Sequence, residues 1–411
     1  MQVSKPKKGY KFVDAGFGKF EEIPEEWKYE EFQDIIKKDN TKKIKIKTLD
    51  YENKGKIPII DQGQDLICGY TNDSSLTYGG ELPVIVFGDH TLAVKFIDFP
   101  FAIGADGTKI IQINQDKGFT KFFYYAIQNR NLVSEGYKRH FSKLRMQKFS
   151  YPSSIPEQQK ITKILSNVDN TLEKTNQLIQ KIELLKKGLM QKLFTQGIGH
   201  SKFKKVDWYY KKQIEIPEEW GMKKLEEVAK VTRGKFGHRP RNDPDYYGGK
   251  HPFIQTGDVE NAQGEIIDYS QTLNEKGLRT SKYFPTNTIV ITIAANIGAT
   301  AITTFPVCFP DSLIGITSKI MNIKFLEYYL RTLKKYLENV AHASAQKNIN
   351  YQNLKPLLIP VPLLPEQDQI VSILSNVDSQ ITKEKLQKSN LELLKKGLMQ
   401  KLLTGKIRVK F

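Results

Sequence analysis

Hydrophobic positions between residues 156 and 197 are spaced alternately by four and three residues. This is the spacing of a helix that buries one narrow stripe against a partner helix. A Pro-Glu-Gln sequence opens the segment and a glycine closes it, as at many helix ends. The pattern predicts one continuous helix of about 40 residues, or ~60 Å at ~1.5 Å per residue. The stripe consists of Ile161, Leu165, Val168, Leu172, Ile179 and Ile182, with Thr175 in the same register.

Residues 365–411 contain the same helix a second time. The sequence ELLKKGLMQKL stands at 183–193 and again at 392–402, and roughly 23 of the 40 positions around each copy agree. Glu384 and Lys388 interrupt the hydrophobic spacing of this copy before leucines resume it. The predicted seam positions are Ile370, Leu374, Val377, Ile381, Leu391 and Leu394, followed by Leu398 and Leu402.

A helix of this length cannot bury its stripe alone, so each copy needs a partner. Because the two copies match in length and phase, we expect them to pack antiparallel within one chain. Two alternatives stay open. Each helix could pack only on its adjacent globular domain, or the helices could pair between two chains.

Between the shared helices lie two blocks that are alike only in outline. IPEEW at 23–27 returns at 216–220, and each block then passes from β-type alternation to an aromatic helix, at 120–132 and 323–340. The sequence predicts an α+β fold with a pseudo-two-fold internal repeat, in which two mixed α/β globular domains are separated by two long antiparallel coiled-coil helices. The expected limits are 1–155 for the first globular domain, 156–197 for the first spacer helix, 198–364 for the second globular domain, and 365–411 for the second spacer helix with the C-terminal tail.

The composition adds an excess of positive charge. Lysine and arginine number 63 against 45 aspartate and glutamate residues, a net charge of +18, which favours an anionic partner such as nucleic acid. A lysine-rich solvated surface is the alternative. No apolar run is long enough to span a membrane, and the N-terminus lacks the apolar core of a signal peptide. Cys68 and Cys308 lie far apart, which fits a cytoplasmic protein without a disulfide or metal site.

The motifs of common enzyme classes are missing from the sequence. There is no GxxxxGK[ST] phosphate loop, no GxGxxG turn, no HExxH zinc motif and no GxSxG elbow. Two Glu-x-Lys triplets, at 26–28 and 52–54, lack the preceding Pro-Asp of a nuclease centre. We therefore expect a binding protein rather than an enzyme.

Four stretches together resemble the specificity (S) subunit of type I restriction–modification enzymes. They are IPEEW at the start of each half, the pair IPEQQKITKILSNVD and LPEQDQIVSILSNVD, the ending LLKKGLMQKLLTGKIR, and FGDHT…ADGTKII at 87–111. The resemblance covers essentially the whole chain. It implies two target recognition domains, each reading one half of a bipartite, gapped sequence of double-stranded DNA.

The resemblance also implies partners. The helices would set the spacing of the two half-sites and dock two methyltransferase (M) subunits, joined for restriction by two restriction (R) subunits. S-adenosylmethionine, ATP and Mg would be cofactors of those partners, and this chain would bind none itself. Two other functions stay open: a DNA methyltransferase or nuclease that acts alone, and a coiled-coil scaffold that binds no DNA.

Basic and polar loops are the candidate DNA contacts, because Lys and Arg bind phosphates whereas Arg, Asn, Gln, Ser and Thr read bases. The loops are 232–243 in the second domain and the post-helix loops 136–145 and 342–348. For the basic loops the alternative is a solvated surface, and for the turns at 89–91 and 256–258 it is a local Asx-type turn. The candidates are Asp89, His90, Thr91, Lys138, Arg139, His140, Lys143, Arg145, Arg233, Lys235, His238, Arg239, Arg241, Thr256, Asp258, Ser344, Gln346 and Lys347.

Overall fold

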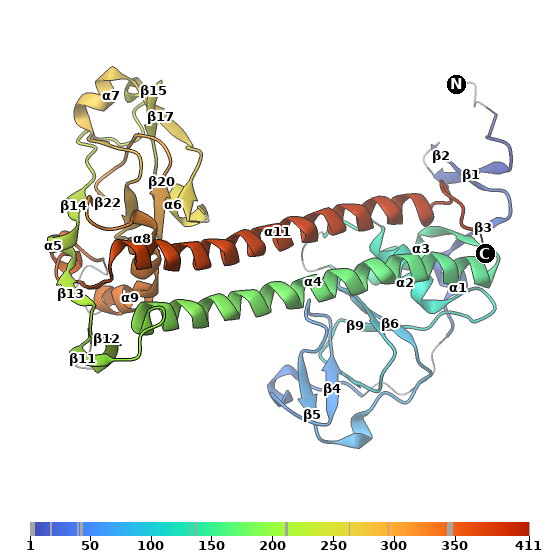
Figure 1. The fold of residues 1–411 in the computed structure, drawn as a ribbon. Helices are drawn as coiled ribbons and strands as arrows, with labels where there is room; N and C mark the ends of the chain where they lie inside the picture. The colour runs from blue at the N-terminus through green and yellow to red at the C-terminus, as the bar shows by residue number, and fades with distance from the viewer. Residues whose placement is uncertain are drawn as a thin grey trace. The chain divides into compact units, whose positions relative to one another are not determined.

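The chain forms two compact units. Unit 1 comprises Met1–Gln177 and Lys385–Phe411, and unit 2 comprises Leu178–Glu384. Both units contain part of two long helices, α4 (Ile155–Gln196) and α11 (Leu364–Leu402) (Figure 1). The unit boundaries fall inside these helices, and the expected domain limits stay predictions. The computed structural model describes residues 5–16, 19–38, 41, 44–130, 132–134, 136, 138–209, 213–262, 264–294, 296–342 and 348–410.

Unit 1 is built from small sheets with the strand orders β1-β2, β3-β10, β5-β4-β8 and β7-β6-β9. The central strand β6 is buried at all its positions, as its uninterrupted apolar sequence predicts, and pairs antiparallel with β7 and β9. The elements are β1 (Tyr10–Gly16), β2 (Lys19–Pro24), β3 (Trp27–Glu31), α1 (Phe32–Ile35), β4 (Ile57–Ile60), β5 (Gly69–Thr71), β6 (Val84–Gly88), β7 (Val94–Ile97), β8 (Ala102–Ile103), β9 (Thr108–Ile111), α2 (Thr120–Gln128), α3 (Phe141–Met146) and β10 (Lys148–Pro152).

Unit 2 contains a five-stranded sheet, β14-β22-β19-β20-β16, a four-stranded sheet, β17-β15-β21-β18, and the pairs β11-β12 and β13-β23. The core beneath the larger sheet packs against α8, whose first turn is capped by Asn322. The elements are β11 (Phe203–Asp207), β12 (Gln213–Pro217), β13 (Gly221–Lys224), α5 (Leu225–Val228), β14 (Lys230–Arg233), β15 (Tyr247–Phe253), α6 (Thr256–Asn261), β16 (Glu265–Ile266), β17 (Gln271–Leu273), α7 (Glu275–Thr280), β18 (Tyr283–Phe284), β19 (Ile289–Thr292), β20 (Thr300–Thr303), β21 (Val307–Cys308), β22 (Leu313–Thr317), α8 (Ile323–Thr332), α9 (Lys334–His342), α10 (Tyr351–Leu354) and β23 (Leu358–Val361).

The single aromatic helix expected at 323–340 is in fact two helices, α8 and α9, which meet at Leu333. The Thr332 hydroxyl donates to the Tyr329 carbonyl at 2.6 Å. Such a bond competes with the regular backbone ladder and accompanies bends in helices. A hydroxyl at this position is therefore a local reason for the break.

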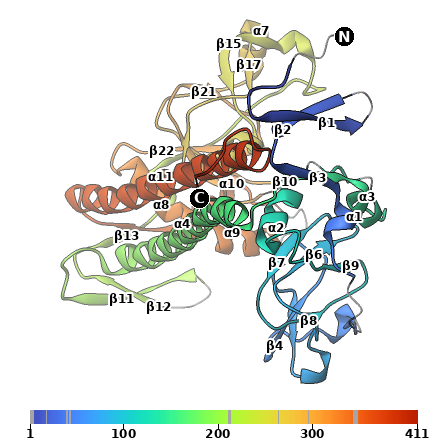
Figure 2. The same cartoon turned by 90° about the vertical axis from the view of Figure 1, so that its right-hand side faces the viewer.

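The two long helices run antiparallel within each unit (Figure 1, Figure 2). In unit 1, Asp169 of α4 pairs with Lys395 of α11 at 2.7 Å, and Glu157 pairs with Arg408, which follows α11, at 2.8 Å. Residue numbers thus rise along one helix as they fall along the other. The expected antiparallel pairing within one chain is confirmed.

Each helix also packs on the globular part of its unit. In unit 1, Ile161 and Leu165 share a core with Trp27 and with Met399 and Leu402 of α11. In unit 2 the corresponding core joins Met190, Leu193 and Phe194 of α4 with Ile370 and Leu374 of α11 and with Trp220. The helices therefore bury their stripes against both a partner helix and a domain.

The internal repeat extends to individual hydrogen bonds. Tyr125 donates to Asp169 at 2.7 Å in unit 1, and Tyr328 donates to Asp378 at 2.6 Å in unit 2. Burial raises the pKa of both tyrosines above the ordinary value, so the hydroxyls stay protonated and act as donors. Asp378 also accepts from Lys186 at 2.5 Å, as Asp169 accepts from Lys395. The predicted pseudo-two-fold repeat is confirmed.

One predicted seam position is wrong. Leu394 is 50 % exposed, whereas the next residue, Lys395, lies in register and reaches Asp169. The seam position four residues after Leu391 is therefore occupied by Lys395, whereas the hydrophobic pattern predicted Leu394 there. Of the other seam residues, Ile161, Leu165, Ile179, Ile182, Ile370, Leu374 and Ile381 are buried, and Val168, Leu172, Val377 and Leu391 are half-buried.

Candidate nucleic-acid interface

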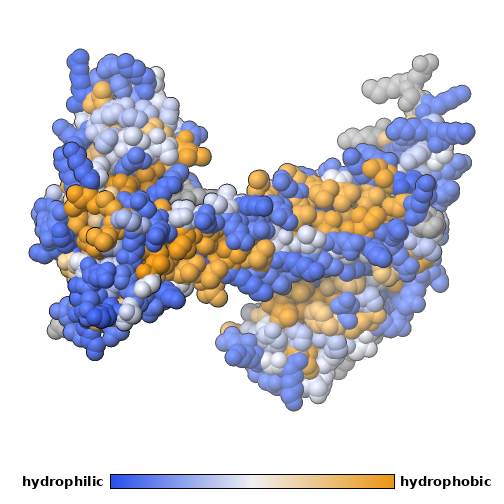
Figure 3. All heavy atoms as spheres, viewed as in Figure 1, coloured by the Kyte–Doolittle hydropathy of each residue, from blue (hydrophilic) through white to orange (hydrophobic). Residues whose placement is uncertain are grey.

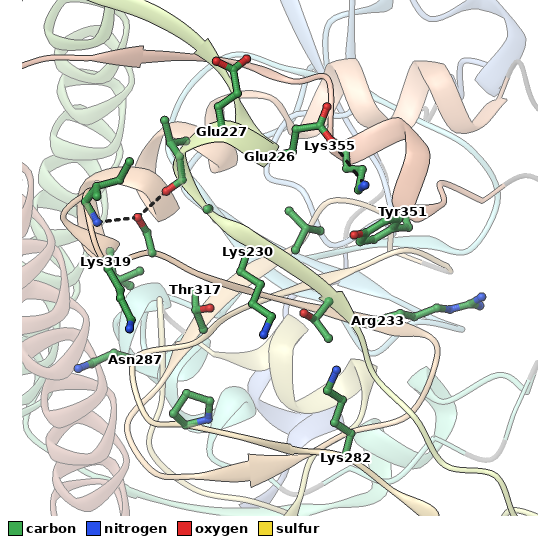
Figure 4. Close-up of a pocket in the computed structure, with 18 of the residues that line it drawn as sticks. Glu226, Glu227, Lys230, Arg233, Lys282, Asn287, Thr317, Lys319, Tyr351 and Lys355 are labelled. Atoms are coloured by element: carbon green, nitrogen blue, oxygen red, sulfur yellow. Dashed lines mark hydrogen bonds and ion pairs between the residues drawn. The ribbon is translucent and has the colours of Figure 1, made fainter.

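Unit 2 has an open cavity of about 1290 Å³ whose rim carries mostly positive charge. Strand β14 contributes to it, and its neighbour β22 leads into the loop that carries Lys319. In Figure 4 the side chains of Lys230 and Lys282 extend into the same space, whereas Arg233 points away from it. The basic residues that line the cavity are Lys230, Arg233, Lys282, Lys319 and Lys355.

Two carboxylates reduce this charge only in part. Glu226 pairs with Lys355 at 3.4 Å, and a hydrogen bond with Tyr351, followed by this pairing, raises the pKa of Lys355. Glu227 instead accepts the backbone N–H of Lys224 at 3.0 Å and so closes the start of α5. Lys230 and Lys319 are exposed and have no acidic partner among the residues that the structure describes. Such a surface suits the phosphates of a nucleic acid.

The loop that follows β14 continues the basic surface. Its exposed cations are Lys235, Arg239 and Arg241, next to Arg233 at the end of β14, and the loop is fixed by a buried aromatic residue, Phe236. The Phe236 ring lies 5.2 Å from that of Phe253, and the Lys235 carbonyl accepts from Ser281 at 2.7 Å. The loop is thus anchored at its start, with its arginines at the surface.

His238 is tied down on two sides. Its Nε2 lies 2.9 Å from Asp243 Oδ2, and its ring stacks on Tyr246 with the centroids 3.8 Å apart. The Asp245 backbone N–H, assisted by His238, lowers the pKa of Asp243 below its usual value. His238 therefore shapes the loop, whereas the arginines beside it keep donors available.

In unit 1 the turn at 89–91 holds the post-helix loop in place. Asp89 Oδ1 accepts the Phe141 N–H at 2.8 Å, and the Asp89 carbonyl lies 2.8 Å from His140 Nδ1. Asp89 and His140 are each only 2 % exposed. The structure therefore does not support these two residues as surface contacts for DNA, because the turn uses their polar groups internally.

The remaining candidates of unit 1 lie at the surface. Lys138, Arg139, Lys143 and Arg145 are exposed, the last two on α3. His90 Nδ1 lies 3.1 Å from the Lys138 carbonyl. His90 thus holds the base of this basic loop, whereas the exposed Thr91 hydroxyl donates to the Gln62 carbonyl and holds the turn itself.

The candidates on α6 have a local role. Asp258 accepts the Gln255 N–H at 2.7 Å and the Ser270 hydroxyl at 3.1 Å, which closes the first turn of the helix that Thr256 begins. Ser344, Gln346 and Lys347 lie outside the residues that the structure describes. In the described ranges, no group of three or more His, Cys, Asp or Glu residues is arranged to hold a metal ion.

Several residues of this surface were not identified from the sequence. Four lysines far apart in the chain are brought together by the two sheets of unit 2 and by α10: Lys230, Lys282, Lys319 and Lys355. Nothing in their sequence neighbourhoods separates them from the other lysines. Asp311, which contacts the arginine loop, lies at the turn before β22 as Asp106 lies at the turn before β9.

A family model described as "Type I restriction modification DNA specificity domain" matches residues 24–184 and again residues 217–393. The chain belongs to this family. The two matches cover most of both halves, including the basic loops and most of both long helices. None of the helices in the described part of the chain is long and apolar enough to cross a membrane.

Relatives with the same kind of description are found in archaea and bacteria. A putative type I restriction enzyme MjaX specificity subunit from Methanocaldococcus jannaschii is 32 % identical over 72 % of this chain and 66 % of its own length. The MjaVIII specificity subunit of that organism is 32 % identical over 62 % of this chain and 61 % of its own length. The alignments thus span somewhat less than two thirds of these relatives. The EcoR124I/EcoR124II specificity subunit of Escherichia coli is 26 % identical over 84 % of this chain and 85 % of its own length.

Solved structures share the fold. The S subunit of a type I restriction–modification system from M. genitalium superposes with a TM-score of 0.59 at 16 % identity, covering 95 % of this chain and 98 % of its own. A chain from a study of complex assembly and conformational transition of the type I R-M system gives a TM-score of 0.56 at 14 % identity, covering 94 % and 99 %. This chain thus shares its fold with both solved structures despite the low identity.

Proposed function

We propose that this chain is the DNA-specificity subunit of a type I restriction–modification complex. Each unit reads one half of a bipartite, gapped target in double-stranded DNA. The observation that carries the proposal is the contrast within one chain: matched contacts such as Tyr125–Asp169 and Tyr328–Asp378 repeat, whereas the exposed basic loops do not. Two units that share their helix contacts but differ in their exposed loops suit a DNA target with two unlike half-sites.

The helices would contribute the spacing. An uninterrupted helix of 42 residues, α4, is paired with one of 39 residues, α11. At ~1.5 Å per residue each is ~60 Å long, whereas one turn of duplex DNA advances ~34–36 Å. A helix pair resists bending far better than a flexible linker. We assign the gap between the half-sites to these helices.

The repeated ELLKKGLMQKL sequence would dock the partners. Leu184 and Leu185 are 71 % and 56 % exposed in the first copy, and Leu393 and Leu394 are 66 % and 50 % exposed in the second. Figure 3 shows apolar surface along the long helices. Adjacent exposed leucines at the same place in both copies suit two identical partners, which we take to be methyltransferase subunits, with restriction subunits joining the assembly.

Catalysis would reside in those partners. We propose that S-adenosylmethionine, ATP and Mg are used there, and that this chain binds DNA in the cytoplasm without modifying it. Methyl transfer or cleavage by the isolated chain would contradict this division of labour. A purified chain tested with labelled S-adenosylmethionine and duplex DNA provides that measurement.

The function is tested by mapping methylated adenines in the host genome with and without this gene. We expect one gapped, two-part motif to lose its methylation when the gene is deleted. Binding of the purified complex to that motif should weaken steeply as salt rises, because phosphate contacts release counterions. An unchanged methylation pattern, or equal binding to random DNA, would overturn the proposal.

A further inference from the structure

Three arginines of unit 2 converge on one acidic residue, Asp311, at the turn before β22. Arg233 donates through Nε to the Asp311 carbonyl at 2.8 Å. Arg241 donates through Nη2 to Asp311 Oδ1, and Arg239 Nη2 lies 3.8 Å from Oδ2. One carboxylate thus meets two guanidinium groups while its backbone holds a third, and the cluster keeps a net positive charge.

The three arginines differ in the donors that they leave available. Arg239 uses Nη1 to donate to the carbonyls of Phe236 and His238, at 2.8 and 2.7 Å, so it acts as a staple of the loop. Among the described residues Arg233 is bonded only through Nε, and Arg241 only through Nη2. A guanidinium has five N–H donors, so Arg233 keeps both amino groups available, and Arg241 keeps Nε, Nη1 and the second N–H of Nη2.

The equivalent turn of unit 1 has the same acid and a different base. Asp106 stands two residues before β9, as Asp311 stands two residues before β22. Asp106 pairs with Lys45 at 3.2 Å, and no arginine contacts it among the described residues. The turn aspartate therefore recurs in both units, but it pairs with a lysine in unit 1 and with arginines in unit 2.

We propose that Arg233 and Arg241 are the guanine-reading residues of unit 2, and that Asp311 is the positioning residue that aims them. This inference rests on the proposed function. Two parallel N–H donors match the O6 and N7 acceptors of guanine in the major groove. Lysines present a rotatable point charge instead, so Lys230, Lys282 and Lys319 would hold the phosphates beside the site.

The carboxylate is what separates base reading from simple charge attraction. Every additional positive charge strengthens a phosphate contact, whereas a carboxylate between the arginines weakens their attraction to a phosphate. A base contact is instead strengthened when the guanidinium is held in one orientation, because discrimination between bases depends on the direction of both N–H donors. The Asp311 carboxylate fixes Arg241 in this way at the expense of net charge, and the Asp311 backbone carbonyl fixes Arg233, which is the arrangement that a reader needs.

The test is a selection from a random duplex library by the full chain in its methyltransferase complex, read by sequencing. The wild-type chain should enrich a two-part motif with at least one G·C pair in the half that unit 2 reads. In the double variant R233A/R241A, preference for that pair should fall roughly 5- to 150-fold. The other half-site should be enriched as in the wild type, which shows that the variant is folded.

Further variants distinguish reading from charge. R233K/R241K keeps the charge and should lose the same discrimination, whereas D311A should lower it without lowering total DNA binding. The matched control is R279A, because Arg279 is an exposed arginine of unit 2 that does not contact Asp311, and it should leave the motif unchanged. If no variant changes the second half-site, the inference fails and the proposed function stands. If the wild-type chain enriches no two-part motif, both fail.

Discussion

Units 1 and 2 are most alike where the long helices meet and least alike where the loops are exposed. In unit 2, Trp220 donates through Nε1 to Glu366 at 2.9 Å, and His200 also reaches that carboxylate at 2.9 Å. In unit 1 the corresponding acid, Glu157, is taken up by Arg408, and the equivalent indole N–H, on Trp27, has no partner among the described residues. We call the paired long helices with the contacts repeated around them the frame. Within it the glutamate is kept in both units, whereas the residues that bind it differ.

Contacts that join the two long helices are the ones that recur in both units. The pairs Lys186–Asp378 and Lys395–Asp169 lie on both helices at once, so a change in one copy would disturb the antiparallel register. The loop at 234–243 forms ion pairs within itself and with the turn at Asp311, so its sequence is free to diverge. Conservation between the two halves thus follows from how many elements each contact joins.

The largest effect is expected from deleting the two indole rings. Trp27 and Trp220 are each about 1 % exposed at the centre of their unit. Replacing either by alanine should lower the free energy of unfolding by about 3–5 kcal/mol, because a large buried ring leaves a cavity. Urea denaturation of the full chain measures it, and a loss below about 1 kcal/mol at either site would contradict the assigned cores.

The exposed leucine pairs come next. L184S/L185S and L393S/L394S should leave urea unfolding unchanged, since both pairs are solvent-exposed, and each should weaken methyltransferase binding about tenfold or more. Sedimentation of the mixed complex should show one partner lost from each double variant. K181S, at an exposed lysine of α4, is the control. Equal partner binding by all variants would contradict the docking assignment.

A conservative pair of variants sharpens the comparison of the two acids. W220F removes a donor from the Glu366 carboxylate, whereas W27F removes an N–H that has no acceptor. W220F should therefore destabilise the chain by about 1–2 kcal/mol more than W27F, because hydrogen bonds to charged groups contribute most. Equal losses in urea denaturation would show that the Glu366 bond contributes nothing.

The smallest effect concerns the repeated lysine–aspartate pairs. Double-mutant cycles on Lys186–Asp378 and Lys395–Asp169 should give equal coupling energies of about 1 kcal/mol or less, because the pairs are partly solvated. Alanine and asparagine variants, measured by urea unfolding, complete each cycle. Coupling in one pair alone would break the equivalence of the two units.

The sequence predicted the frame better than the surface. Heptad spacing located both long helices, because a buried stripe leaves a direct periodic signal, and it failed at Leu394, where geometry puts Lys395 in the seam. Charge drew attention to Arg233, Arg239 and Arg241 but not to Asp311, which orders them. The cavity lysines could not be predicted, since strand pairing, not sequence proximity, gathers them.

The central claim is that one repeated frame carries two independent readers. The most direct measurement replaces residues 28–154, which lie between IPEEW and α4, with a second copy of residues 221–363, which lie between IPEEW and α11. DNA selection with this chimera, in its methyltransferase complex, should yield a motif whose two halves are both the half-site of unit 2. Persistence of the original first half-site, or loss of all DNA preference in a chimera that still binds its methyltransferase, would contradict the account.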